Sequence, residues 1–204
     1  MTTVAELRVG SAAQAWRAIG LDVVDDAMSI GDIVLRCSAP DSLPSVALVV
    51  AWTLRDALSA TPSIDGLTTL HTGTAPPSST ATHVLGVTAF DHLVVMTSSL
   101  DRTCVAMEAA TGAALKRVRE AGSVRQGFHR LGSLIVEVVE TADVSTDVAS
   151  FWGFVLVVDD IHTAADRLGP ELLAAPKPAV QPGRFIASFR PAAGLGAAVA
   201  LMSP

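Results

Sequence analysis

One apolar stretch of the chain predicts a strand that runs directly into a helix. Phe90 to Met96 is mostly apolar and carries a single histidine, His92. Ser99-Leu100-Asp101-Arg102 follows, and a serine before such a run is a typical helix N-cap. Phe151 to Asp160 has the same order, with Trp152 where the first stretch has His92. A strand–helix unit that occurs twice predicts a repeated fold whose copies differ in their polar residues.

The residues around each of these units extend the pattern to β-α-β-β-β. The helices are expected at 99–110, closed by Gly112, and at 161–168, closed by Gly169, because glycine commonly ends a helix. Alternating or apolar runs predict the strands. They are expected at 87–97, 115–120, 126–131 and 134–141, and at 151–158, 172–173, 184–190 and 197–202.

The N-terminal part predicts the same order in a weaker form. Its helix is expected at 12–19 with Ser11 as the N-cap. Its strands are expected at 4–10, 21–24, 30–37 and 45–54. Ser59 to Thr82 is rich in Ser, Thr, Pro and Gly, which is typical of a linker.

These patterns predict three modules and an α+β fold class. We expect an N-terminal module at 1–74, a linker at 75–86 and a two-module domain at 87–204, divided into 87–142 and 150–204. One helix for every four strands leaves too few crossover helices for a doubly wound parallel sheet. The expected architecture is therefore a set of cupped, mostly antiparallel sheets with helices on the outer face.

Composition excludes several classes of protein. Of the 204 residues, 50% are hydrophobic and 17% are charged, which is typical of a compact chain with a core. The net charge of -6 gives no footprint for nucleic acid. The longest apolar runs are strand-length, so no membrane span is expected. Cys37 and Cys104 are expected to be buried thiols in a cytoplasmic protein that has no secretory signal.

The order of these pieces resembles the vicinal oxygen chelate superfamily, the group of glyoxalases, bleomycin-resistance proteins and extradiol dioxygenases. The stretches that carry the resemblance are Phe90-Asp91-His92-Leu93-Val94-Val95, Leu100-Asp101, Leu134 to Val139, Val157-Val158-Asp159-Asp160-Ile161, and Phe189 to Met202. The resemblance implies that paired modules form a cup around a site. It also implies that any metal ligands come from the first and last strands of the modules.

Two of the four ligand positions implied by the resemblance hold a metal-binding residue. They are His92 and Glu137, whereas Trp152 and Ala200 occupy the other two. An imidazole and a carboxylate suit Zn, Ni, Mn or Fe, and Glu137 would also be the catalytic group. His129 is the strongest candidate for a third ligand.

A structural role explains the same two residues without a metal. His92 would then be a hydrogen-bonded histidine and Glu137 an ion-pair partner, with Arg130 or Arg190 as its cation. A buried carboxylate needs such a partner or a shifted pKa.

A second set of residues has the character of a ligand-binding wall. Its members offer aromatic surface for a flat molecule or a polar group to fix its orientation. They are Gln126, Phe128, Arg130, Trp152, Phe154 and Arg190. The same residues would equally serve as core aromatics and as the solvated side of a strand.

Two functions from different classes are therefore open. The first is a metal-assisted lyase, isomerase or dioxygenase acting on a small oxygenated molecule. The second is a metal-free protein that binds or sequesters a small molecule such as a drug. The unpaired N-terminal module predicts either a homodimer or packing against the outside of the two-module domain.

Overall fold

The computed structural model describes residues 1–38, 49–75, 82–196 and 198–204, and its strands form two sheets. The strands of the six-stranded sheet are β1 (Thr3–Val9), β2 (Ala27–Ile30), β3 (Ile33–Cys37), β4 (Val49–Arg55), β5 (Ser63–Ile64) and β6 (Leu67–Thr72). The strands of the eight-stranded sheet are β7 (Val87–Thr97), β8 (Arg117–Ala121), β9 (Val124–Leu131), β10 (Leu134–Glu140), β11 (Ser150–Val158), β12 (Lys177–Pro178), β13 (Phe185–Ser188) and β14 (Ala198–Met202). The α+β class predicted from the sequence is confirmed.

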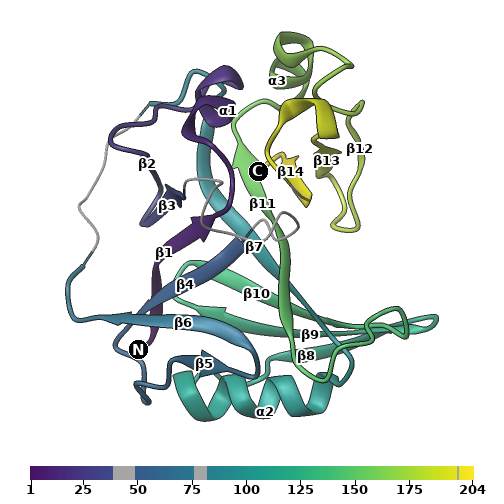
Figure 1. The fold of residues 1–204 in the computed structure, drawn as a ribbon. Coiled ribbons are helices and arrows are strands. Elements are labelled where there is room, and N and C mark those ends of the chain that lie inside the picture. Colours follow the sequence, from purple (N-terminus) through teal and green to yellow (C-terminus); the bar gives the residue numbers. More distant parts are fainter. Residues whose placement is uncertain (39–48, 76–81, 197) are drawn as a thin grey trace.

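The eight-stranded sheet consists of two modules joined at their first strands. Its order is β12-β13-β14-β11-β7-β10-β9-β8. Within each module the first strand pairs in parallel with the last, β7 with β10 and β11 with β14. The long strands β7 and β11 pair antiparallel in the middle and link the two ends of the molecule (Figure 1). The repeated strand–helix unit of the sequence therefore corresponds to a repeated half-sheet.

Local sequence signals set the two helices of this sheet. Helix α2 (Leu100–Thr111) begins after Ser99, whose hydroxyl accepts a hydrogen bond from the Arg102 N–H, and ends at Gly112 with φ of 70°. Helix α3 (Ile161–Leu168) begins after Asp160, whose carboxylate accepts hydrogen bonds from two backbone N–H groups. Both helices match the predicted ranges. No helix in the described ranges is both long and apolar enough to cross a membrane.

Helix α1 (Ala13–Ala18) starts differently from the prediction. Ala12 is its N-cap residue and makes no side-chain capping bond. The Ser11 hydroxyl instead accepts a hydrogen bond from the buried Trp16 indole N–H, at 2.7 Å. A buried indole needs an acceptor, and this requirement decides where the serine points.

The N-terminal sheet contains two reduced modules where the sequence predicted one. Strand β1 pairs in parallel with β3, β4 pairs in parallel with β6, and β1 and β4 pair antiparallel between them. The strand predicted at 45–54 therefore does not close the first module: its described part, β4, begins a second one. Strands β5 and β6 lie in the Ser-, Thr-, Pro- and Gly-rich stretch 59–82, at the end of the predicted N-terminal module, where no strand was expected. Residues 39–48 and 76–81 lie outside the described residues.

Smaller differences concern strand boundaries. The strand predicted at 21–24 is reduced to a single bridge between Val24 and Ala27, and β2 begins only at that point. The strand predicted at 172–173 is likewise one bridge, from Leu173 to Phe189. The short edge strand β12 lies between the strands predicted at 172–173 and 184–190, where no strand was predicted.

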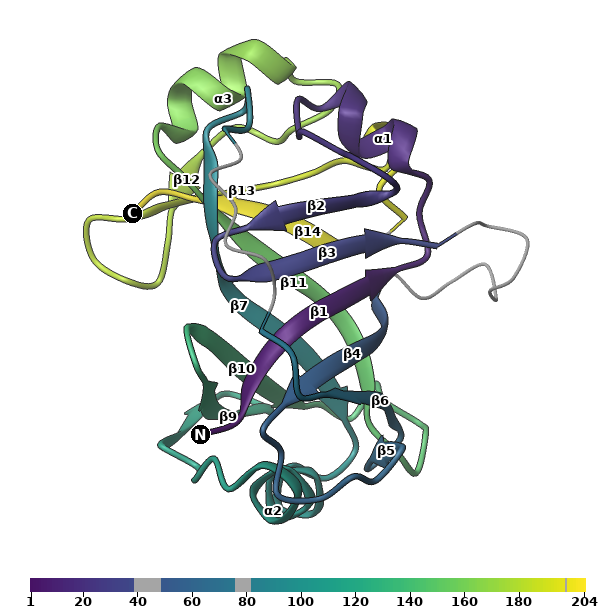
Figure 2. The same ribbon diagram turned by 90° about the vertical axis from the view of Figure 1, so that its left-hand side faces the viewer.

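The hydrophobic core lies between the two sheets. Trp52 of β4 meets the Phe151 ring edge-to-face at 5.4 Å, and Trp16 of α1 stacks on Phe154 at 6.1 Å. Figure 2 shows the six-stranded sheet in front of β7 and β11, with α2 at one end and α1 and α3 at the other. The N-terminal part thus packs against the outside of the two-module sheet and leaves the opposite face free.

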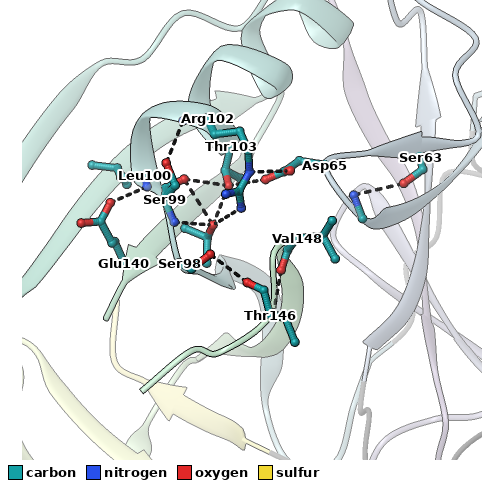
Figure 3. Close-up of polar contacts among 12 residues, drawn as sticks. Ser63, Asp65, Ser98, Ser99, Leu100, Arg102, Thr103, Glu140, Thr146 and Val148 are labelled. Atoms are coloured by element: carbon teal, nitrogen blue, oxygen red, sulfur yellow. Dashed lines mark hydrogen bonds and ion pairs between the residues drawn. The ribbon is translucent and has the colours of Figure 1, made fainter. Parts of the chain in front are cut away.

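A polar contact fastens the N-terminal sheet to α2. Asp65, in the turn between β5 and β6, accepts a hydrogen bond from Arg102 Nε at 2.8 Å and another from the Thr103 hydroxyl (Figure 3). The Asp65 side chain is only 7% exposed. The β5–β6 hairpin is therefore part of the folded structure.

Candidate functional site

The free face of the eight-stranded sheet contains two adjoining cavities of about 580 Å³ and 750 Å³. This size suits a small organic ligand. Strands β8 and β12 are the two edges of the sheet, yet residues of both line the larger cavity. The sheet therefore curls into a cup. The residues that line both cavities are His92, Gln126, Glu137, Ile186 and Ser188.

His92 and Glu137 meet at the centre of the cup. They lie on β7 and β10, which pair in parallel with His92 opposite Ile135, so Glu137 is two residues along on the same face. The His92 Nε2 and Glu137 Oε2 atoms are 3.5 Å apart. The two residues aligned from the sequence are thus brought together.

A β-bulge adds Asp91 to this pair. Strict alternation would place Asp91 and His92 on opposite faces of β7. The register with β11 skips Asp91, because Val155 is opposite His92 and Leu156 is opposite Phe90. A bulge of this kind turns a side chain toward a site. Asp91 Oδ2 consequently lies 2.7 Å from His92 Nδ1.

Arg184 completes a chain of charged groups across the cup. Its guanidinium lies 2.7 Å from Asp91 Oδ1 and donates a hydrogen bond to the Ser203 carbonyl. Burial alone would raise the Asp91 pKa, but the hydrogen bonds from His92 and Arg184 lower it below the usual value. An ionised Asp91 accepts a hydrogen bond from the His92 Nδ1–H group, which leaves Nε2 facing the cup.

Glu137 is a largely buried carboxylate, with a side chain that is only 14% exposed. Burial raises its pKa, and the nearby His92 and Arg119 oppose this shift only in part. Gln126 Nε2 donates a hydrogen bond to Glu137 Oε1 at 2.6 Å. Glu137 therefore gives up its proton less readily than an exposed carboxyl group does.

The donor set does not fit a resident metal ion. Trp152 and Ala200 offer no ligand atom, and zinc usually takes at least three protein ligands. His129, predicted as the third ligand, is on the opposite face of β9, where its Nδ1 bonds the Ala113 carbonyl at 2.8 Å. Across the described ranges, no group of three His, Cys, Asp or Glu side chains is placed to hold a metal.

The predicted ligand-binding residues separate into two groups. Trp152, Phe128 and Gln126 line the cavities, and Trp152 is 53% exposed. Phe154 also borders the smaller cavity, but its ring is buried in the core against Trp16 and Phe90. Trp152 also lies at a bulge of β11, because Phe151 and Gly153 pair with consecutive residues of β7 and Trp152 has no partner there.

Arg130 and Arg190 belong to the other group, because neither lines either cavity. Arg130 donates to the Ser133 carbonyl at the β9–β10 turn, and Arg190 is exposed beside the turn before β14. Neither forms an ion pair with Glu137 among the described residues, so neither is the cation predicted for that carboxylate, whose nearest ring nitrogen is His92 Nε2 at 3.5 Å.

Sequence reasoning missed Lys177 and three further contributors to the cup. They are Asp91, because alternation points it away, and Arg117 and Arg119, because an edge strand is usually solvated. A charged residue next to a strand histidine is the only sequence signal for the first. No local signal shows that the edge β8 curls over the cavity.

Comparison with known proteins finds no matching family model and no matching curated protein. Solved structures do match part of the chain. Methylmalonyl-CoA epimerase from Mycobacterium tuberculosis has 16% identity over 58% of this chain and 89% of its own, with a TM-score of 0.49.

Two further solved structures are similar to the chain at the same level. A variant of Streptomyces coelicolor methylmalonyl-CoA epimerase in complex with 2-nitronate-propionyl-CoA has 18% identity over 57% of this chain and 97% of its own, with a TM-score of 0.46. A hypothetical protein from Bacillus halodurans has 13% identity over 56% and 93%, with a TM-score of 0.47.

The paired modules themselves carry the family likeness. Each has a first strand, a helix and a last strand that returns in parallel beside the first, and the pair encloses a cup. It is in this order and pairing of strands that the chain resembles the vicinal oxygen chelate superfamily.

Proposed function

We propose that the cup binds a small organic molecule and does so without a resident metal ion. The observation that carries the proposal is the pair of substitutions at the implied ligand positions. Trp152 and Ala200 supply apolar surface where a metal site would need donors, and both line the 580 Å³ cavity. The cup is thereby an apolar pocket with a polar centre.

The wall of the smaller cavity supports binding of an apolar group. Its lining is mainly aliphatic and aromatic, which is typical of small-molecule sites. The apolar members besides Trp152 and Ala200 are Val94, Met96, Val139, Phe154, Val155, Ile186, Phe189, Ala198 and Val199. His92 and Glu137 lie at the floor of this wall and would orient one polar group of the ligand.

Acid–base catalysis is a second candidate function, favoured by one observation. Asp91 holds His92 Nδ1 at 2.7 Å, and Nε2 faces Glu137, a carboxylate with a raised pKa. Two proton carriers on one side of a pocket are an arrangement that can move a proton on a bound molecule. A catalytic protein would lose turnover, but keep binding, in His92→Gln.

Trp152 makes the binding proposal testable. The neutral dye Nile red is titrated into untagged protein, Trp152→Ser and Val105→Ser, since Val105 is an exposed apolar residue outside the cup. We expect saturable fluorescence enhancement that is weakened about tenfold in Trp152→Ser and unchanged in Val105→Ser. Equal binding by all three proteins would overturn the proposal.

A second experiment distinguishes a metal-free site from a site that holds a metal ion. Untagged protein is analysed for bound metal, and the titration is repeated with a chelator. We expect no stoichiometric metal and the same affinity for the dye. Stoichiometric metal that is lost in His92→Ala would refute the metal-free site.

A further inference from the structure

We propose that the ligand of the cup is an amphipathic anion, whose apolar body lies on Trp152 and whose anionic group lies between Arg117, Arg119 and Lys177. This inference rests on the proposed binding function and adds a chemical class to it. It comes from the arrangement of charge around the larger cavity.

The three cations come from opposite edges of one sheet. Arg117 and Arg119 lie on β8, and Lys177 lies on β12, at the two ends of the strand order. All three nevertheless line the 750 Å³ cavity. The curl of the sheet therefore gathers positive charge at one cavity from strands that share no backbone pairing.

These cations have no counter-ion in the described part of the chain. No ion pair within 4.0 Å forms there for Arg117, Arg119 or Lys177. Two carboxylates line the same cavity. Asp91 is already paired with Arg184 and His92, and Glu137 accepts a hydrogen bond from Gln126 and forms no ion pair within 4.0 Å with any of the three cations. In a chain of net charge -6, three unneutralised cations around one cavity are a local excess that attracts anions.

Contacts with residues that line the cavities orient the side chains of Arg117 and Arg119. The Arg117 guanidinium lies over the Phe128 ring, 4.8 Å from its centroid, which reduces the conformations open to a long side chain. Arg119 is near enough to Glu137 to oppose the rise of its pKa. Both arginines are thus directed toward the cup.

The smaller, apolar cavity and the larger cavity with the three cations adjoin at a set of polar residues that lines both. His92, Gln126 and Glu137 line both cavities, Trp152 lines only the smaller, and the three cations line only the larger. One molecule that spans the floor would therefore place its apolar body at one end and its charge at the other. A planar carboxylate or a phosphate would both suit the arginine forks.

Three probes of one shape test the charge preference by calorimetry: 2-naphthol, 2-naphthoate and 2-naphthyl phosphate at pH 7. We expect both anions to bind about tenfold more tightly than naphthol at low salt, and the preference to shrink as salt is raised. The ratio of the two anions distinguishes a carboxylate site from a phosphate site.

A matched pair of variants locates the preference. Arg117→Gln with Arg119→Gln removes the β8 charges, and Arg167→Gln with Arg190→Gln removes two exposed arginines outside both cavities. We expect only the first pair to abolish the preference while leaving naphthol binding intact. Thermal unfolding of both pairs verifies that each is folded.

The possible results distinguish failure of the amphipathic-anion proposal from failure of the proposed small-molecule binding. If naphthol binds and the anions bind no better, the amphipathic-anion proposal is wrong while the binding cup stands. If no probe binds and Nile red also fails, both proposals are wrong. If the preference persists without the β8 arginines, the anionic group lies elsewhere and the assignment fails.

Discussion

Replacing Asp65 by asparagine removes the charge that fastens the N-terminal sheet to α2. Asp65 has φ of 47°, a left-handed conformation that asparagine tolerates and alanine does not. Asparagine therefore keeps the backbone and the shape while removing the carboxylate. The partners left behind are the Arg102 guanidinium and the buried Thr103 hydroxyl.

The expected loss follows from these two hydrogen bonds. A hydrogen bond to a charged group contributes about 1.5–3 kcal/mol, but Arg102 is 39% exposed, so water replaces much of its share. We expect Asp65→Asn to lower the free energy of unfolding by about 2 kcal/mol, and Asp65→Ala by about 1 kcal/mol more because of backbone strain. For a chain of this size, 2 kcal/mol lowers Tm by about 4–8 °C.

Urea unfolding at pH 7 measures the effect. Asp25→Asn is the matched control, because Asp25 also has a positive φ, of 48°, and is exposed with no ion pair in the described residues. We expect the control to change stability by less than about 0.5 kcal/mol. An Asp65→Asn protein as stable as the control would refute the reasoning, and would mean that the contact is neutral in solution.

Three further predictions concern ionisable groups. Glu137 has a raised pKa, so its ionisation destabilises the fold as pH rises above the unfolded value of about 4.3. Glu137→Gln should therefore raise Tm at pH 7 but not at pH 4, and an equal gain at both would contradict this. Asp91 has a lowered pKa, so its contribution is present above about pH 3.9 and is lost as pH falls through the folded value. Asp91→Asn should cost stability at pH 7 and little at pH 2. Burial raises the pKa of Cys37 and Cys104 to about 11, so a disulfide reagent at pH 8 should label them only after unfolding, and rapid native labelling would count against their burial.

The helices and the two central strands could be predicted because their signals are local. Ser99 and Asp160 each accept backbone hydrogen bonds at a helix start, and glycines follow both ends. Strand β7 spans the residues expected from its apolar run. Such signals depend on neighbours a few residues away, so a single sequence contains them.

The β5–β6 hairpin was missed for a compositional reason. Its Ser and Thr residues suggested a linker, although Thr is β-branched and favours strands. The Asp65-Gly66 pair between them is a typical two-residue hairpin turn, and Gly66 has φ of 94°. That pair is the signal that could have found the hairpin.

Some residues of the site could be predicted from the sequence, but the directions of Asp91 and His129 could not. His92 and Glu137 follow from the positions that the resemblance implies, and Trp152 from the repeat. Asp91 does not, because its direction depends on a bulge opposite β11, whose partner residues lie about 60 positions away. His129 was misplaced as a ligand because the choice between two strand faces is a tertiary decision.

The sequence by itself determined the modular order, the helix ends and the identity of the central pair. It also determined that Trp152 and Ala200 occupy two of the ligand positions that the resemblance implies, since residue types need no structure to be read. Only the tertiary structure decided which sheet face is buried by the N-terminal part, which way Asp91 points, and that Arg117 and Lys177 share one cavity. The physical reason is that curvature and bulges arise from pairing between distant strands, and that pairing alone brings the two edges of the sheet together.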